Sequence, residues 1–218
     1  MCVKKNLRLL RQTYLNLKNL KILYFIPLLF LFIILPFISI GYVISSGREE
    51  VTYYKIFAEF QRYIPFMATW WVVFGLKEYA EGDGKEILRV YKKGLIIDFF
   101  IIFFWYISHV ISLFILYNIF LENYWLDFIL ISIQSLAFAS STFLFMFAFK
   151  TISIPFLINI FYEIFCMYAN MNFLKFINIL SEPRMDTIND LLIPYCPLLF
   201  LSLVFIFYGN AYYKRKAF

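Results

Sequence analysis

Long apolar segments are the feature that most constrains the fold of this chain. Each has about the 20 residues that an α-helix needs to cross the hydrocarbon core of a bilayer. Hydrophobic residues make up 63% of the 218 residues, and 29 are phenylalanine, more than a small soluble core can bury. The sequence therefore predicts an all-α, polytopic membrane protein with one transmembrane domain over residues 1–218. The six expected spans cover residues 22–45, 57–76, 95–119, 127–149, 151–172 and 191–213.

The segment before the first span is basic and amphipathic. Residues 1–21 contain no acidic side chain, and their apolar residues fall on one stripe of a helical wheel. This pattern predicts a helix that lies in the membrane interface with its basic face toward anionic headgroups. The alternative is the charged start of a secretory signal. The apolar run that follows is longer than a signal core, which favours a retained span.

The distribution of basic residues predicts the orientation. An even number of spans places both termini on one side, and most of the 20 basic residues fall on that side. By the positive-inside rule, both termini are cytosolic, segment 77–94 is cytosolic and segment 173–190 is external. The net charge of +6 is explained by this arrangement, so no nucleic-acid partner is expected. The basic residues expected on the external side are Arg48, Lys55, Arg62, Lys175 and Arg184.

Segment 77–94 is the longest polar interruption between two expected spans. It reads KEYAEGDGKEILRVYKKG, with Gly82 and Gly84 around Asp83. Asp83 followed three residues later by Glu86 has the form of a capping box, which predicts a short helix from about residue 85 to 93.

The apolar residues of this short helix recur at helical spacing. Ile87, Leu88, Tyr91 and Leu95 are the residues expected on its apolar face. An exposed apolar face predicts a docking site for a partner. The alternative is a solvated, basic loop that only sets the topology.

Four polar residues inside expected spans are candidates for a translocation path: Glu163, Asn159, His109 and Gln134. Glu163 and Asn159 lie one turn apart in the fifth span. An embedded carboxylate is expensive unless it is protonated, paired or facing water, so Glu163 is either a path or proton-relay residue or the partner of Gln134 or His109 in an interhelical hydrogen bond. For His109 alone, an interhelical partner is the favoured interpretation.

The sequence contains none of the motifs that carry soluble catalytic chemistry. It has no Walker-type phosphate loop, no HExxH and no GxSxG. The three cysteines, Cys2, Cys166 and Cys196, lack metal-binding spacing. The chain is therefore expected not to be an enzyme and to hold no metal and no cofactor of its own.

The layout resembles the type-2 ABC exporter permeases (ABC-2 type). Shared features are the basic interfacial helix, six spans, a coupling helix between the second and third spans and a longer external segment between the fifth and sixth. The connection between the second and third spans in that family often begins with acidic residues and a glycine, followed by a glutamate and a leucine. Glu78, Glu81, Gly82, Glu86 and Leu88 look like that pattern.

The resemblance implies a permease subunit in the cytoplasmic membrane of a bacterium. Two such subunits, identical or different, would pair, and each would engage a cytosolic ATPase subunit that binds the ATP. Compact permeases of this size are similar to those that export peptides or protect against bacteriocins and other antibiotics, so the cargo is expected to be amphipathic. The residues implied in ATPase coupling are Glu81, Gly82, Asp83, Glu86, Ile87, Leu88 and Tyr91.

Two alternatives remain open. The chain could be a gradient-driven carrier that uses Glu163 and Asp98 as proton sites. It could also be a scaffold protein of the membrane that transports nothing, or an intramembrane enzyme. No second carboxylate or nucleophile at a matching depth supports the enzyme.

Overall fold

A computed structural model describes residues 18, 20–47, 49–120, 125–168, 180 and 188–215. These residues are almost all helical and include no β-strand, which confirms the expected all-α class. The expected interfacial helix (1–21) and external segment (173–190) lie largely outside the described residues. The elements are α2 (Ile22–Leu29), the π-helical η1 (Phe30–Ile34), α3 (Leu35–Ser46), α4 (Glu50–Ala80), α5 (Lys85–Tyr91), α6 (Ile96–Phe120), α7 (Trp125–Phe149), α8 (Ser153–Tyr168) and α9 (Ile188–Arg215).

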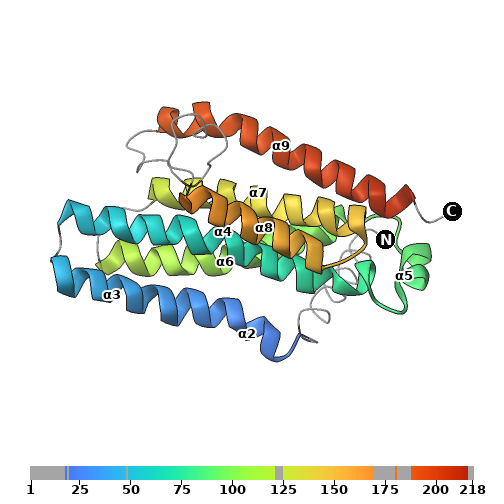
Figure 1. Cartoon of the computed structure of the whole chain (residues 1–218), viewed down its shortest axis with the longest axis horizontal. Helices are drawn as coiled ribbons and strands as arrows, with labels where there is room; N and C mark the ends of the chain where they lie inside the picture. The colour runs from blue at the N-terminus through green and yellow to red at the C-terminus, as the bar shows by residue number, and fades with distance from the viewer. Residues whose placement is uncertain are drawn as a thin grey trace, which may run out of the picture.

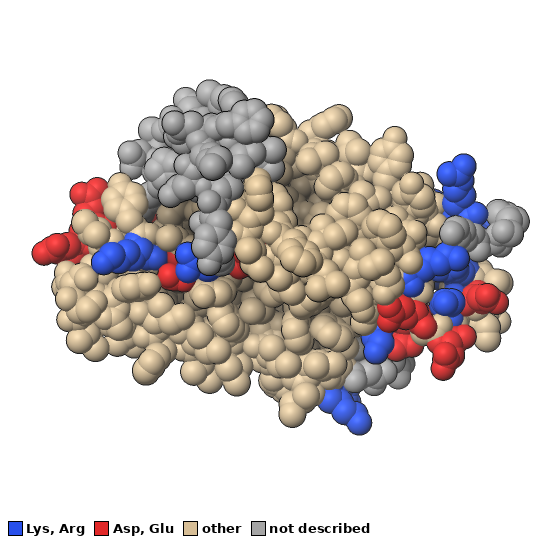
Figure 2. Space-filling model, in the orientation of Figure 1, with Lys and Arg blue, Asp and Glu red and all other residues tan. Residues whose placement is uncertain are grey.

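The long helices run along the long axis of the molecule and alternate in direction (Figure 1). The start of α2 and the end of α9 lie toward the same end of the bundle, and the short α5 projects beyond the other helices at that end. Lys, Arg, Asp and Glu gather toward the two ends of the face drawn in Figure 2, and the stretch between them carries none of these residues. Such a charge-free middle suits the hydrocarbon core of a bilayer.

Four described helical segments are long and apolar enough to cross a membrane, consistent with a multi-pass membrane protein. Six spans stay a prediction. α4 is long enough but has too low a mean hydropathy, and the apolar part of α8 is short, so neither belongs to the four. The four segments are Ile22–Ser46, Ile96–Phe120, Trp125–Phe149 and Tyr195–Arg215.

α4 extends beyond the expected span of 57–76 at both ends. Tyr53, before the expected start, and Tyr79, after the expected end, are 6% and 4% exposed. α4 therefore packs on its neighbours beyond both ends of the purely apolar run. Tyrosine suits these ends, because it can bury its ring and leave its hydroxyl at the membrane interface.

α7 lies at the centre of the bundle and packs most extensively against α9 and α4. Gly209 allows the close approach of α9, because a Cβ atom there would lie 2.6 Å from Phe143 Cδ1 and 3.1 Å from Leu144 Cα. Small residues at helix crossings commonly allow membrane helices to approach one another closely. α2 is held against α4 by Trp70, whose Nε1 donates to Leu23 O at 3.0 Å.

Candidate functional site

The short helix α5 begins at residue 85, as the sequence predicts, and ends at Tyr91, two residues before the expected end. Gly84 is its N-cap, and no side chain caps it, so the expected cap by Asp83 is wrong. A capping box joins the N-cap to the third helical residue. With Gly84 as the N-cap, Glu86 is the second helical residue and Ile87 the third, so the geometry of the box is lost. Glu86 still lies in the first turn, where a carboxylate interacts favourably with the helix dipole.

The apolar residues of α5 divide between two environments. Ile87, Val90 and Tyr91 are 65%, 75% and 85% exposed, at the i, i+3 and i+4 spacing of one helix face. Leu88 packs against the core and Leu95 is fully buried beyond the end of the helix. The expected face of Ile87, Leu88, Tyr91 and Leu95 is therefore corrected: its exposed part, the α5 patch, consists of Ile87, Val90 and Tyr91.

The turn between α4 and α5 is fixed by Glu81 and Gly82. Glu81 Oε1 accepts a hydrogen bond from the backbone N–H of Ile152 at 2.7 Å, just before the start of α8. A Cβ atom at Gly82 would lie 2.6 Å from Glu78 O, so only glycine fits without a shift of the backbone. Glu81 and Gly82, two of the seven residues in the coupling prediction, thus shape this turn, and Glu81 ties it to the connection between α7 and α8.

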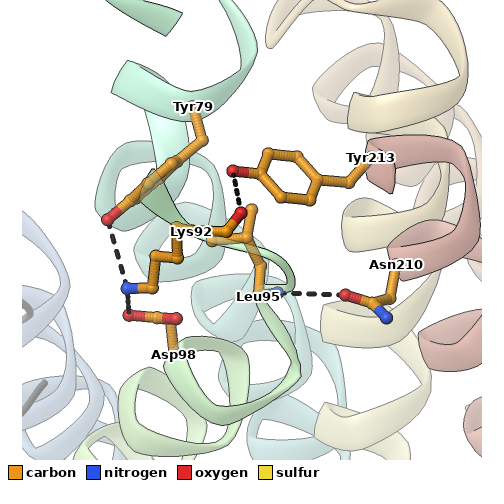
Figure 3. A network of polar contacts seen from close by, with 6 residues as sticks. All are labelled: Tyr79, Lys92, Leu95, Asp98, Asn210 and Tyr213. Atoms are coloured by element: carbon orange, nitrogen blue, oxygen red, sulfur yellow. Dashed lines mark hydrogen bonds and ion pairs between the residues drawn. The ribbon is translucent and has the colours of Figure 1, made fainter. Parts of the chain in front are cut away.

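A polar network binds the end of α5 to α4 and α6 (Figure 3). Lys92 Nζ forms an ion pair with Asp98 in the first turn of α6 and donates to Tyr79 OH of α4 at 3.3 Å. The side chains of Lys92 and Asp98 are 13% and 3% exposed, so the pair is largely removed from water. A buried pair of this kind strongly restricts where its two helices can move, because separating it would leave a buried charge alone.

The same network reaches α9. Tyr213 OH donates to the backbone carbonyl of Lys92 at 3.1 Å, and Asn210 Oδ1 accepts from the backbone N–H of Leu95 at 3.0 Å (Figure 3). Asn210 thereby supplies a partner for an N–H just before the start of α6. We call this set of residues the α5 joint. Its members are Tyr79, Lys92, Leu95, Asp98, Asn210 and Tyr213.

A second polar cluster lies inside the bundle around Asn159 of α8. Asn159 Nδ2 donates to Thr142 Oγ1 at 2.7 Å and to Thr69 Oγ1 at 2.9 Å, which joins α8 to α7 and α4. Ser141 Oγ donates to Asn159 Oδ1 at 3.1 Å. Asn159 is 3% exposed, and both threonines are fully buried. This cluster is a satisfied interhelical network of the kind that specifies helix packing in a membrane.

The other three candidate path residues have different surroundings. Glu163 is 8% exposed and interacts electrostatically with Arg62 of α4. The ring nitrogen Nδ1 of His109 lies 2.8 Å from Trp105 O, and its ring packs edge-on against Trp71. Gln134 is fully buried on α7. Glu163 thus interacts with Arg62, its expected pairing with Gln134 or His109 stays a prediction, and the residues described around His109 are those of its own helix and α4.

Sequence reasoning missed Val90 and most of the α5 joint. Val90 could have been assigned to the exposed apolar face from the sequence, because it lies three residues after Ile87 and residues at this spacing share a helix face. Asn210 carried a signal as well, since a polar residue in an apolar span needs a partner. Tyr213 and Tyr79 carried none, because interfacial tyrosines are common at the ends of spans.

The α5 patch and the α5 joint together form a short helix with an exposed apolar face that is tied to α4, α6 and α9. Within the described part of the chain, no group of three or more His, Cys, Asp or Glu side chains is placed to hold a metal ion. A short rigid helix tied to three long ones can pass a displacement from a partner to the bundle. No protein-family model, curated protein or solved structure matches this chain.

Proposed function

We propose that this chain is the permease subunit of an ATP-driven exporter of the ABC-2 type. The observation that carries the proposal is the α5 patch: three large apolar side chains exposed together on a short helix at one end of an apolar bundle. Exposed apolar residues that are clustered mark sites of partner binding. In this proposal α5 is the coupling helix, it faces the cytosol, and it inserts the patch into a groove of a separate ATPase subunit.

The α5 joint supports the mechanical part of the proposal. Lys92, at the end of α5, contacts side chains of α4, α6 and α9, namely Tyr79, Asp98 and Tyr213. A displacement of α5 by the ATPase therefore acts on three helices at once and is not absorbed by a flexible loop. ATP binding and hydrolysis on the partner would in this way rock the bundle, while this chain binds no nucleotide.

The remaining parts of the proposal concern partners and cargo. A second permease subunit, identical or different, would complete the path through the bacterial cytoplasmic membrane. The cargo would be a peptide, a bacteriocin or another amphipathic antibiotic, and the role would be export or immunity. These parts follow from the resemblance in layout.

A gradient-driven carrier is a second candidate function, favoured by one observation. Glu163 is a nearly buried carboxylate on an apolar helix, and Arg62 of the neighbouring α4 acts on it electrostatically. Embedded carboxylates of this kind occur in proton relays. Dissipation of the proton gradient with ATP maintained would stop such a carrier and leave an ATP-driven exporter active.

Charges placed in the α5 patch are expected to abolish binding of the ATPase. The double substitution Val90→Glu with Tyr91→Glu puts two carboxylates on a surface that must be desolvated on docking, which costs several kcal/mol. The measurement is co-purification with the ABC ATPase encoded nearest to this chain's gene, after co-expression. We expect wild-type levels of the variant in the membrane and loss of the ATPase from the purified complex.

The matched control makes the same substitutions at the other end of the molecule. Val51 and Tyr54 are 57% and 43% exposed near the start of α4, so Val51→Glu with Tyr54→Glu adds the same charges to residues of the same types. Retention of the ATPase by this control and its loss from the α5 variant support the proposal. Equal recovery with both variants, or no recovery with the wild type, would contradict it.

A further inference from the structure

A groove runs along α7 between α8 and α9. α9 packs along α7, and α8 contacts α7 on another side (Figure 1). The groove has a volume of about 410 Å³ and lies among aromatic side chains, including Phe138, Tyr162 and Phe205. Sites for small molecules have about 300–1,000 Å³ and are mostly apolar with a few convergent polar groups. The polar groups among its lining residues are the amide of Asn159 and the hydroxyls of Ser141, Tyr162 and Ser202.

The amide of Asn159 has one orientation, which is fixed by the residues behind it. The hydroxyl of Thr142 donates its one proton to Phe138 O at 2.7 Å or to Thr69 Oγ1 at 3.3 Å, and in either case its oxygen accepts from Asn159 Nδ2. The second amide proton goes to Thr69 Oγ1. The NH₂ end of Asn159 therefore faces the threonines, and Oδ1 faces Ser141, which lines the groove with Asn159.

Asn159 Oδ1 shares the one proton of Ser141 with a backbone carbonyl. Ser141 Oγ lies 2.9 Å from Phe138 O and 3.1 Å from Asn159 Oδ1, and a hydroxyl has one proton to donate. An amide oxygen has two lone pairs, so Asn159 Oδ1 can accept a second hydrogen bond beside the one from Ser141. A ligand that brings an O–H or N–H to this largely buried atom therefore gains a hydrogen bond.

We propose that this groove binds a neutral amphiphile that places an apolar body among the aromatic side chains and donates one O–H or N–H to Asn159 Oδ1. None of the described residues that line the groove is charged, so a cationic or anionic group would lose its hydration without compensation. The walls belong to α7, α8 and the apolar part of α9, so the ligand reaches the groove from within the bilayer. The proposal concerns binding to this chain alone and does not depend on coupling to an ATPase.

The test is photolabelling of the purified chain in phosphatidylcholine nanodiscs with dodecanol that carries a diazirine. We expect saturable labelling that maps to peptides of α7, α8 and α9. Unlabelled dodecanol should compete, whereas dodecyl methyl ether, which has no donor, and dodecyltrimethylammonium, which is charged, should each compete about tenfold more weakly. Labelling spread over all lipid-facing helices without saturation would overturn the proposal, and equal competition by alcohol and ether would overturn the role of Asn159.

Two variants provide a matched comparison. Ala137→Phe places a larger side chain in the groove and should abolish saturable labelling. Leu116→Phe makes a change of similar kind in a different groove, between α3 and α6, and should leave labelling unchanged. Equal labelling of both variants would contradict the proposal. If Ala137→Phe does not fold, the wild-type competition series decides the question alone.

Discussion

Replacement of Asp98 by alanine should lower the free energy of unfolding by about 3–5 kcal/mol, because it leaves a buried ammonium group without its counter-charge. Lys92 is 13% exposed at its side chain and has only Tyr79 OH as a further side-chain hydrogen-bond partner among the contacts described above. The change also removes a carboxylate from the first turn of α6, where it interacts favourably with the helix dipole. The measurement is equilibrium unfolding of the purified protein in mixed micelles.

Two further variants separate the ion pair from the general effect of losing a carboxylate. The double variant Lys92→Met with Asp98→Leu should recover most of the lost stability, because replacing both charges with apolar groups leaves nothing buried and unpaired. Glu50→Ala removes an exposed carboxylate at the other end of the molecule and should change stability by no more than about 0.5 kcal/mol. A single Asp98→Ala variant as stable as the wild type would show that the pair does not hold α5 to α6.

Asn210→Leu should loosen the junction between α5 and α6. The N–H of Leu95 is buried and bonds to Asn210 Oδ1, so the substitution leaves a buried donor without its partner, at a cost of about 1–3 kcal/mol. The effect should be local: hydrogen exchange at Leu95 and in the first turn of α6 should accelerate, while exchange in the middle of α7 stays slow.

Asn118→Leu is the matched control for this prediction. Asn118 Nδ2 donates to Phe114 O within α6, and a helical carbonyl already accepts a backbone bond. We expect exchange at Leu95 in this control to equal that of the wild type. Unchanged exchange at Leu95 in Asn210→Leu would mean that α9 does not hold the start of α6.

The helices that sequence analysis places best are those with long apolar runs and few charges. α6 and α7 begin and end within two residues of the expected spans, because loss of apolar character and the helix end coincide there. α4 is placed less well. Its ends, near Tyr53 and Tyr79, are amphipathic and stay helical by packing on neighbours, which the composition of a local window does not reveal.

The candidate site was predictable where it depends on local sequence and not where it depends on distant contacts. The existence of a short helix between α4 and α6 follows from its spacing and its flanking glycines. The division of its apolar face does not follow from the local sequence, because Leu88 packs against a core that other helices form. The bonds of Leu95 with Asn210 and of Lys92 with Tyr213 join residues more than a hundred positions apart, so no local pattern predicts them.

The central claim is that α5 faces the cytosol, where an ATPase can reach the α5 patch. The most direct test is cysteine labelling in intact cells, with Cys2, Cys166 and Cys196 replaced by alanine. Tyr91→Cys reports on α5, and Glu50→Cys reports on the opposite end of α4. A membrane-impermeant maleimide should label Glu50→Cys in intact cells and Tyr91→Cys only after the cells are opened. Labelling of Tyr91→Cys from outside intact cells would contradict the account.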